Sequence, residues 1–245
     1  TSSFNTRQNG YDISADVLGY PESYYTPASE GLQEIQVIRG AASLQYGTQF
    51  GGLINFITKK PSSKPIEVTT RNTIGSFGLY TNFTSLSGTN GKFSYYTYYN
   101  YKKGNGFRPN SEFESKNIFT HLGYEFTKNT KLEAEVTYLD YLAQQAGGLT
   151  GRLFNENPFQ SNRTRNWFKV DWFLYNLKLK HKFSENTNFS FNFFGLNASR
   201  KAIGFRDRRV DLPDNIEEPR ELLIGNFDNF GFESRLVSNY KVYNK

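Results

Sequence analysis

The central and C-terminal parts of this 245-residue chain contain a series of long segments in which polar and apolar residues alternate. Such alternation is typical of β-strands, because successive side chains of a strand point to opposite faces. Most segments reach the roughly 9–11 residues that a strand needs to cross a bilayer obliquely, whereas strands of soluble proteins average about 5–6 residues. We predict about eight antiparallel strands: Ile66–Ile74, Leu79–Gly88, Lys92–Lys102, Lys116–Thr127, Lys131–Tyr141, Asp171–Ser184, Asn188–Ser199 and Asn226–Val242.

The two faces of these predicted strands differ in chemistry. On the segment 171–184, one face carries mainly Phe, Tyr and Leu. The other face carries amide and amine side chains: Asn176, Lys178, Lys180 and Lys182. A membrane barrel turns its apolar face to lipid and its polar face to the interior, and aromatic residues near the strand ends form its girdles. Glu133 and Glu135 share a polar face, so we expect them on a solvated wall of the barrel lumen.

The connections between the predicted strands alternate in length. The turns TNG, KNT and ENT are short, and YNK at the chain end begins one more. Apart from the short link 75–78, the connections between them are long: Lys103–Ser115, Leu142–Val170 and Arg200–Gly225. Short periplasmic turns and long extracellular loops are typical of outer-membrane barrels. A large soluble β-sandwich would explain the alternation, but neither the strand lengths nor the one-sided loop lengths.

Composition excludes several classes of protein. The chain has no Cys, which excludes disulfide scaffolds and Cys-based metal sites, and it has only two histidines. No window approaches the roughly 18 apolar residues of a transmembrane helix. No G-x-S-x-G, H-E-x-x-H or P-loop motif is present, so we expect no enzyme. Aromatic residues among lysines would suit single-stranded nucleic acid, but the girdle explains them with fewer assumptions. The absence of Met, with residue 1 in mid-pattern, predicts a fragment of a longer chain.

A second informative stretch is Glu34–Thr58, EIQVIRGAASLQYGTQFGGLINFIT. It predicts a strand, a turn, a short helical or loop piece, a second turn and another strand. Gly40 ends the first strand and the pair Gly51-Gly52 opens the second, and glycine allows a positive φ or a close backbone approach. On this pattern alone, an ordinary β-hairpin at the edge of a soluble domain is an equal alternative.

The same stretch resembles the end of the plug domain of TonB-dependent outer-membrane receptors. That plug closes with I-x-V-x-R-G, small residues, Y-G and then G-G-x-I-N-x-x-T-K. The matching residues are Ile35, Val37, Arg39, Gly40, Ser43, Tyr46, Gly47, Gly51, Gly52, Ile54, Asn55, Thr58 and Lys59. The resemblance implies that residues 1–62 are the C-terminal part of an α+β plug. Residues 63–245 would then be the first part of a transmembrane β-barrel in the bacterial outer membrane, joined through the linker KKPSSKP.

The resemblance also implies structural roles for four plug residues. In the family, the Arg of the R-G motif pairs with barrel glutamates and latches the plug to the barrel, which here implies Arg39. Its partners would lie on later barrel strands that this chain lacks. Gly40, Gly51 and Gly52 would be the glycines of the plug turns. An incomplete barrel exposes two strand edges, so we expect that the fragment is not stable alone.

Within the family, the chain is most similar to the ferric dicitrate receptor branch, in Asn9–Pro27 and in the loop that contains GGL and NRTRNWF. The similarity places Tyr20 where that branch has a ligand-contacting Gln. The branch's ligand arginine aligns near Gly225, which is a departure.

Arginine forks bind carboxylates in bidentate fashion, so the candidate ligand residues are Tyr20, Arg206, Arg208, Arg209 and Arg220. The alternative is a solvated loop of mutually paired charges, because these arginines alternate with Asp and Glu.

The function implied by the resemblance is active import of a ferric citrate-like chelate. Its partners would be the ferric chelate, the TonB energy-coupling complex and outer-membrane lipid, with no nucleic acid. Iron would be cargo, so we expect neither a cofactor nor a resident metal. Within transport, another siderophore, cobalamin or a carbohydrate remains an alternative ligand. A passive porin or adhesin is a weaker alternative, because passive pores have no plug.

Overall fold

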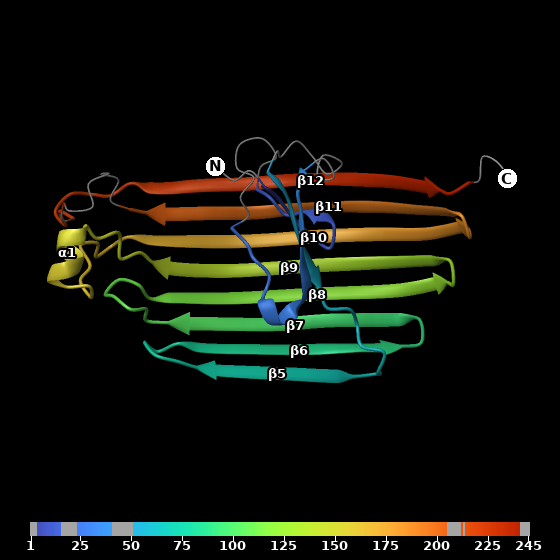
Figure 1. Cartoon of the computed structure of the whole chain (residues 1–245), viewed down its shortest axis with the longest axis horizontal. Helices are drawn as coiled ribbons and strands as arrows, with labels where there is room; N and C mark the ends of the chain where they lie inside the picture. Colours follow the sequence, from blue (N-terminus) through green and yellow to red (C-terminus); the bar gives the residue numbers. More distant parts are fainter. Residues whose placement is uncertain (1–3, 16–23, 41–50, 205–211, 213, 241–245) are drawn as a thin grey trace.

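The computed structural model describes residues 4–15, 24–40, 51–204, 212 and 214–240. Its main element is an eight-stranded antiparallel sheet in which each strand pairs with its neighbours in sequence (Figure 1). The strands are β5 (Glu67–Ile74), β6 (Tyr80–Asn90), β7 (Phe93–Gly104), β8 (Phe113–Thr127), β9 (Thr130–Gln144), β10 (Trp167–Ser184), β11 (Thr187–Ile203) and β12 (Leu222–Ser238). The sheet confirms the predicted partial barrel with its series of long strands.

Several strands are longer than predicted. Trp167, the first residue of β10, lies opposite Gln144, the last residue of β9. Ile203 at the end of β11 lies opposite Leu222, so Arg200 belongs to the barrel wall and not to a loop as the sequence suggested. The ladder continues because each backbone group there finds a partner on the neighbouring strand. Between β9 and β10 lies the short helix α1 (Gly151–Glu156), which the sequence analysis did not predict.

A smaller four-stranded sheet precedes the barrel strands, in the order β2-β1-β4-β3. Its strands are β1 (Phe4–Gln8), β2 (Tyr11–Asp12), β3 (Leu32–Ile38) and β4 (Gly52–Thr58). Strands β3 and β4 lie where the sequence predicted two strands, and they pair antiparallel, while β1 runs parallel to β4. Residues 41–50 lie outside the described part of the chain. In the described residues before β5, which we call the plug after the predicted domain, a 3-10 turn at Ser29–Gly31 is the only helical element.

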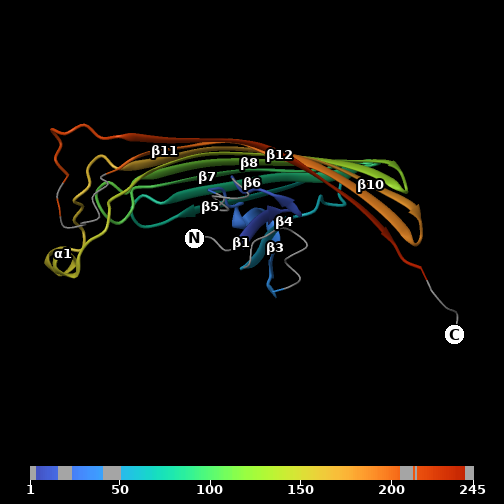
Figure 2. The ribbon, with the colours of Figure 1, turned by 90° about the horizontal axis from the view of Figure 1, so that it is seen from above.

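The small sheet packs against the concave face of the large one (Figure 2). Trp172, Leu174 and Leu196 from this wall are buried in one cluster with Tyr11 and Ile13 of the plug. The wall facing the plug is therefore apolar at this level, whereas we expected a polar lumen face. The plug excludes water here, so apolar side chains are buried on this face too. On the opposite face Phe173, Leu177 and Phe193 remain exposed, as expected for side chains that meet lipid.

The segment between β4 and β5 connects the two sheets. Ser62 N donates to Ser87 Oγ at 2.7 Å, and Thr89 N donates to the Lys64 carbonyl at 2.8 Å. These bonds fix the segment to the end of β6. The predicted domain boundary between residues 62 and 63 falls in this segment and remains a prediction.

Candidate functional site

A buried polar network joins the plug to the barrel wall. The Asn9 Nδ2 group, in the turn between β1 and β2, lies 2.8 and 3.0 Å from the two Glu135 oxygens on β9. The His121 Nδ1 atom on β8 lies 3.0 Å from Glu135 Oε1, and both side chains are buried. Our expectation that Glu135 lies on a solvated wall was wrong, because the plug turn covers it.

A second plug-to-wall contact is ionic. Arg7 Nη1 on β1 lies 2.7 Å from Glu233 Oε1 on β12, and only 5 % of the Arg7 side chain is exposed. Lys178 Nζ donates to the Asn9 carbonyl at 3.1 Å. A buried charge is costly unless it is paired, so the Arg7–Glu233 pair favours the docked plug. Arg39 is exposed, and its predicted partners lie beyond this chain, so its role as a latch stays a prediction.

Next to these contacts, hydroxyl and amide groups form a fully buried chain. Tyr25 Oη donates to Gln8 Oε1 at 3.0 Å. Gln8 Nε2 in turn donates to Tyr11 Oη at 2.8 Å and to Thr137 Oγ1 of β9 at 3.2 Å. Burial raises the pKa of Tyr11 and of Tyr25 well above the ordinary tyrosine value, so both phenols stay protonated near neutral pH. A satisfied buried network of this kind favours one docking geometry.

An arginine and several aromatic rings meet toward the long-loop end of the wall. The Tyr24 ring of the plug lies 5.6 Å from Phe168 and 5.9 Å from Trp172, measured between ring centroids. Arg200 Nη1 on β11 donates to Tyr24 Oη at 2.9 Å, and its guanidinium carbon lies 5.5 Å from the ring centroid. Arg200 is directly opposite Gly225 on β12. The Arg200 guanidinium therefore lies beside Gly225, near which the ferric dicitrate branch has its ligand arginine.

The two long loops are joined at Asp214, whose side chain is 2 % exposed. Arg165 of the β9–β10 loop donates through Nη2 to Asp214 Oδ1 at 2.9 Å and through Nε to Oδ2 at 3.0 Å. Arg220 Nε donates to Asp214 Oδ1 at 2.9 Å. The hydrogen bonds from Arg165 and then from Arg220 hold the pKa of Asp214 at about 2. The pairing of Arg220 with Asp214 therefore agrees with the alternative from the sequence, in which the charged residues of this loop pair with one another.

Removing the Asp214 charge is expected to release the two loops from each other. In Asp214→Asn, hydrogen exchange of residues 214–221 in the intact protein should be about tenfold faster, because two arginines lose a buried charged acceptor. Since the pKa of Asp214 is lowered from 3.8 to about 2, its contribution is complete above pH 3.8 and is lost as the pH falls through 2. Glu217→Gln, in the same loop, is the control. Equal exchange in both variants would argue against the clamp.

Of the other predicted site residues, the structure describes only the glycines. Tyr20, Arg206, Arg208 and Arg209 lie outside the described residues. Gly40 has a φ of +71° and Gly52 a φ of +123°, and both flank the plug hairpin together with Gly51. Within the described ranges, no group of three or more His, Asp or Glu side chains is arranged to hold a metal ion. None of the described helices is long and apolar enough to span a bilayer.

Comparison with solved structures places the fold. The unliganded ferric citrate transporter FecA superposes with a TM-score of 0.82 at 20 % sequence identity, over 99 % of this chain and 36 % of that one. BauA, the ferric preacinetobactin receptor from Acinetobacter baumannii, gives 0.77 at 12 % identity, over 99 % and 37 %. The copper transporter OprC gives 0.75 at 15 % identity, over 98 % and 36 %. No family model matches the chain.

Both parts of the molecule, a plug sheet and a curved wall of long antiparallel strands, define a class of protein. The chain has the fold of TonB-dependent outer-membrane receptors, as the sequence resemblance implied. It spans 36 % of the length of FecA, and its similar structures are transport receptors.

Proposed function

We propose that this chain is part of an outer-membrane receptor that binds a ferric citrate-like chelate and imports it with energy supplied by TonB. In this proposal the ligand enters from the long-loop side and binds where the plug meets the wall. Iron is the cargo, and no covalent chemistry, cofactor or nucleic acid takes part. The observation that carries the proposal is the position of Arg200 beside Tyr24.

Arg200 lies on a strand of the wall, whereas Arg163, Arg165 and Arg220 belong to the long loops. Arg163 and Arg165 donate to acceptors of the β11–β12 loop, and Arg220 donates to acceptors within that loop. Arg200 instead projects from the wall toward the plug, where its Nη1 group donates to the Tyr24 hydroxyl. A carboxylate makes a charge-assisted bond about twice as strong as a neutral one, and in bidentate geometry with an arginine. The Tyr24, Phe168 and Trp172 rings border this position, and their low polarity strengthens such a bond further.

Gly225 supports the same ligand class. A Cβ atom at Gly225 would lie 3.1 Å from the Phe227 ring and 3.9 Å from Arg200 Nε, so a side chain at this position would lie against the guanidinium. We propose that Arg200 supplies, from the neighbouring strand, the guanidinium that the ferric dicitrate branch places near position 225. Tyr20, Arg206, Arg208 and Arg209 remain proposed as additional ligand residues.

The test is a fluorescence titration of the intact receptor, meaning the longer chain that we expect to contain these residues, in outer-membrane vesicles. Saturable binding of ferric citrate, but not of iron-free citrate or a hydroxamate siderophore, is the expected result. Arg200→Ala should weaken that binding about tenfold or more, the usual effect of losing a hydrogen bond to a charged group.

Lys201→Ala is the matched control, because Lys201 is the next residue and points to the opposite face of β11. No binding of ferric citrate, or a preference for the hydroxamate, would contradict the ferric citrate assignment. Unchanged binding in Arg200→Ala would contradict only the role of Arg200.

A further inference from the structure

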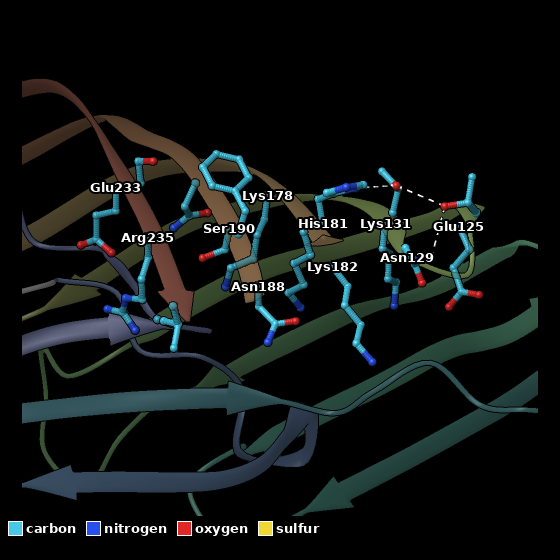
Figure 3. Close-up of a pocket in the computed structure, with 18 of the residues that line it drawn as sticks. Glu125, Asn129, Lys131, Lys178, His181, Lys182, Asn188, Ser190, Glu233 and Arg235 are labelled. Atoms are coloured by element: carbon cyan, nitrogen blue, oxygen red, sulfur yellow. Dashed lines mark hydrogen bonds between the residues drawn. The ribbon is translucent and has the colours of Figure 1, made fainter. Parts of the chain in front are cut away.

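A cavity lies at the short-turn end of the wall, opposite the end that carries Arg200. It has a volume of about 810 Å³ and is bounded by Gly10 of the plug and by the short-turn ends of β8 to β12 (Figure 3). The turn at Lys128 and Asn129 forms part of its rim. Short turns face the periplasm in outer-membrane barrels, so this cavity opens to the periplasmic side. Its volume is in the range of small-molecule sites, about 300–1,000 Å³.

The wall of this cavity carries an unusual row of cations. Lys131 on β9 lies directly opposite Lys180 on β10, Lys180 lies opposite Ser190 on β11, and Ser190 lies opposite Arg235 on β12. Figure 3 shows Lys131 of β9, Ser190 of β11 and Arg235 of β12 projecting from the same face of the wall. Like charges directly opposite each other destabilise a sheet. An anionic ligand bound to this row would offset the repulsion between its cations, which explains why the sheet carries them.

The neighbouring carboxylates neutralise only part of this charge. Glu133 lies 2.6 Å from Lys180 and 3.2 Å from Lys131, so one carboxylate serves two amines. Lys182 pairs with Glu185, whose side chain is 90 % exposed. Arg235 makes no ion pair with any residue of the described ranges. The remaining charge is therefore positive and lines an accessible cavity.

The position of the cavity relates it to transport. Its lining residue Glu233 forms the ion pair with Arg7, and Lys178 donates to the Asn9 carbonyl. These contacts close the space between the plug turn and the wall. A ligand that passes between plug and wall would therefore leave into this cavity once they open.

We propose that the row of Lys131, Lys180, Ser190 and Arg235 is a second anion-binding site, which receives a multiply charged carboxylate chelate on the periplasmic side of the plug. The inference rests on the proposed import of such a chelate. The two lysines and the arginine provide the charge, and the Ser190 hydroxyl between them provides a neutral donor.

The experiment is calorimetric titration of the detergent-solubilised intact receptor with ferric citrate, because both ends of the barrel are then accessible. The wild type should bind two equivalents. The double variant Lys180→Gln/Arg235→Gln should lose one of them, the one whose affinity falls more steeply with added salt, since it depends on several exposed charges. Lys92→Gln, which removes an exposed cation from another short turn, should retain both.

The outcomes separate this site from the proposed ligand site at Arg200. A single equivalent that only Arg200→Ala removes would overturn the second site and leave the proposed function standing. Two equivalents that both persist in the double variant would also overturn it. A single equivalent that the double variant removes and Arg200→Ala leaves would support the site in the cavity and contradict the ligand site at Arg200. No binding at all would contradict both.

Discussion

Glu135→Ala is expected to loosen the plug from the barrel wall more than any other single change in the interface. Asn9 Nδ2 and His121 Nδ1 both contact this buried carboxylate. Removing it leaves the buried His121 imidazole without this partner, and Asn9 Nδ2 loses a charged acceptor and keeps, among the described residues, only Thr58 Oγ1; each loss costs about 1–3 kcal/mol. We therefore expect docking of the plug to weaken by about 3 kcal/mol in the intact receptor. The measurement is the ion conductance of the receptor in planar bilayers during a urea titration, since an undocked plug opens a path for ions.

Two comparisons test this explanation. Glu135→Gln keeps one side-chain oxygen as an acceptor, so its effect should lie between the wild type and Glu135→Ala. Glu185→Ala removes a carboxylate from an exposed turn, where an ion pair is worth about 0–1 kcal/mol, and should behave as the wild type. If Glu135→Ala and Glu185→Ala conduct at the same urea concentration, the network does not hold the plug.

The barrel wall could be predicted from the sequence because its signal is local. Strand length and alternation are read from consecutive residues, and the short turns mark the strand ends. The hairpin of β3 and β4 was predictable for the same reason, with glycines at both inner ends of its strands. These features depend little on what the strands later contact.

The plug-to-wall contacts could not be predicted, because they depend on tertiary packing. Strand β1, with Asn5, Thr6, Arg7 and Gln8, has no apolar alternation and was read as a turn-rich segment. Its polar residues are buried only because the wall supplies acceptors such as Glu233. The same holds for Arg200, which the sequence placed in a loop. That it lies beside Gly225 follows from the register of β11 and β12, which no single segment reveals.

Gly52→Ala is expected to disrupt the plug hairpin. Gly52 has a φ of +123°, and a Cβ atom there would lie 2.4 Å from the carbonyl oxygen of Ile38 on the paired strand. A backbone atom in a ladder cannot move aside as a flexible side chain can, so steric overlap adds to the strain of the positive φ. We expect a loss of at least about 3 kcal/mol, which is the range of severe backbone and packing defects.

Gly40→Ala separates the two causes. Gly40 has a φ of +71°, but a Cβ atom there would have no heavy atom within 4 Å. As far as the described residues go, its substitution should therefore show the conformational strain alone, about 1–2 kcal/mol. The measurement is protease sensitivity of the plug in the intact receptor in outer-membrane vesicles, together with binding of ferric citrate. Gly52→Ala should be cleaved much faster than Gly40→Ala and bind less ligand. Equal sensitivity would mean that positive φ alone, and not the close approach to Ile38, explains why glycine is needed at position 52.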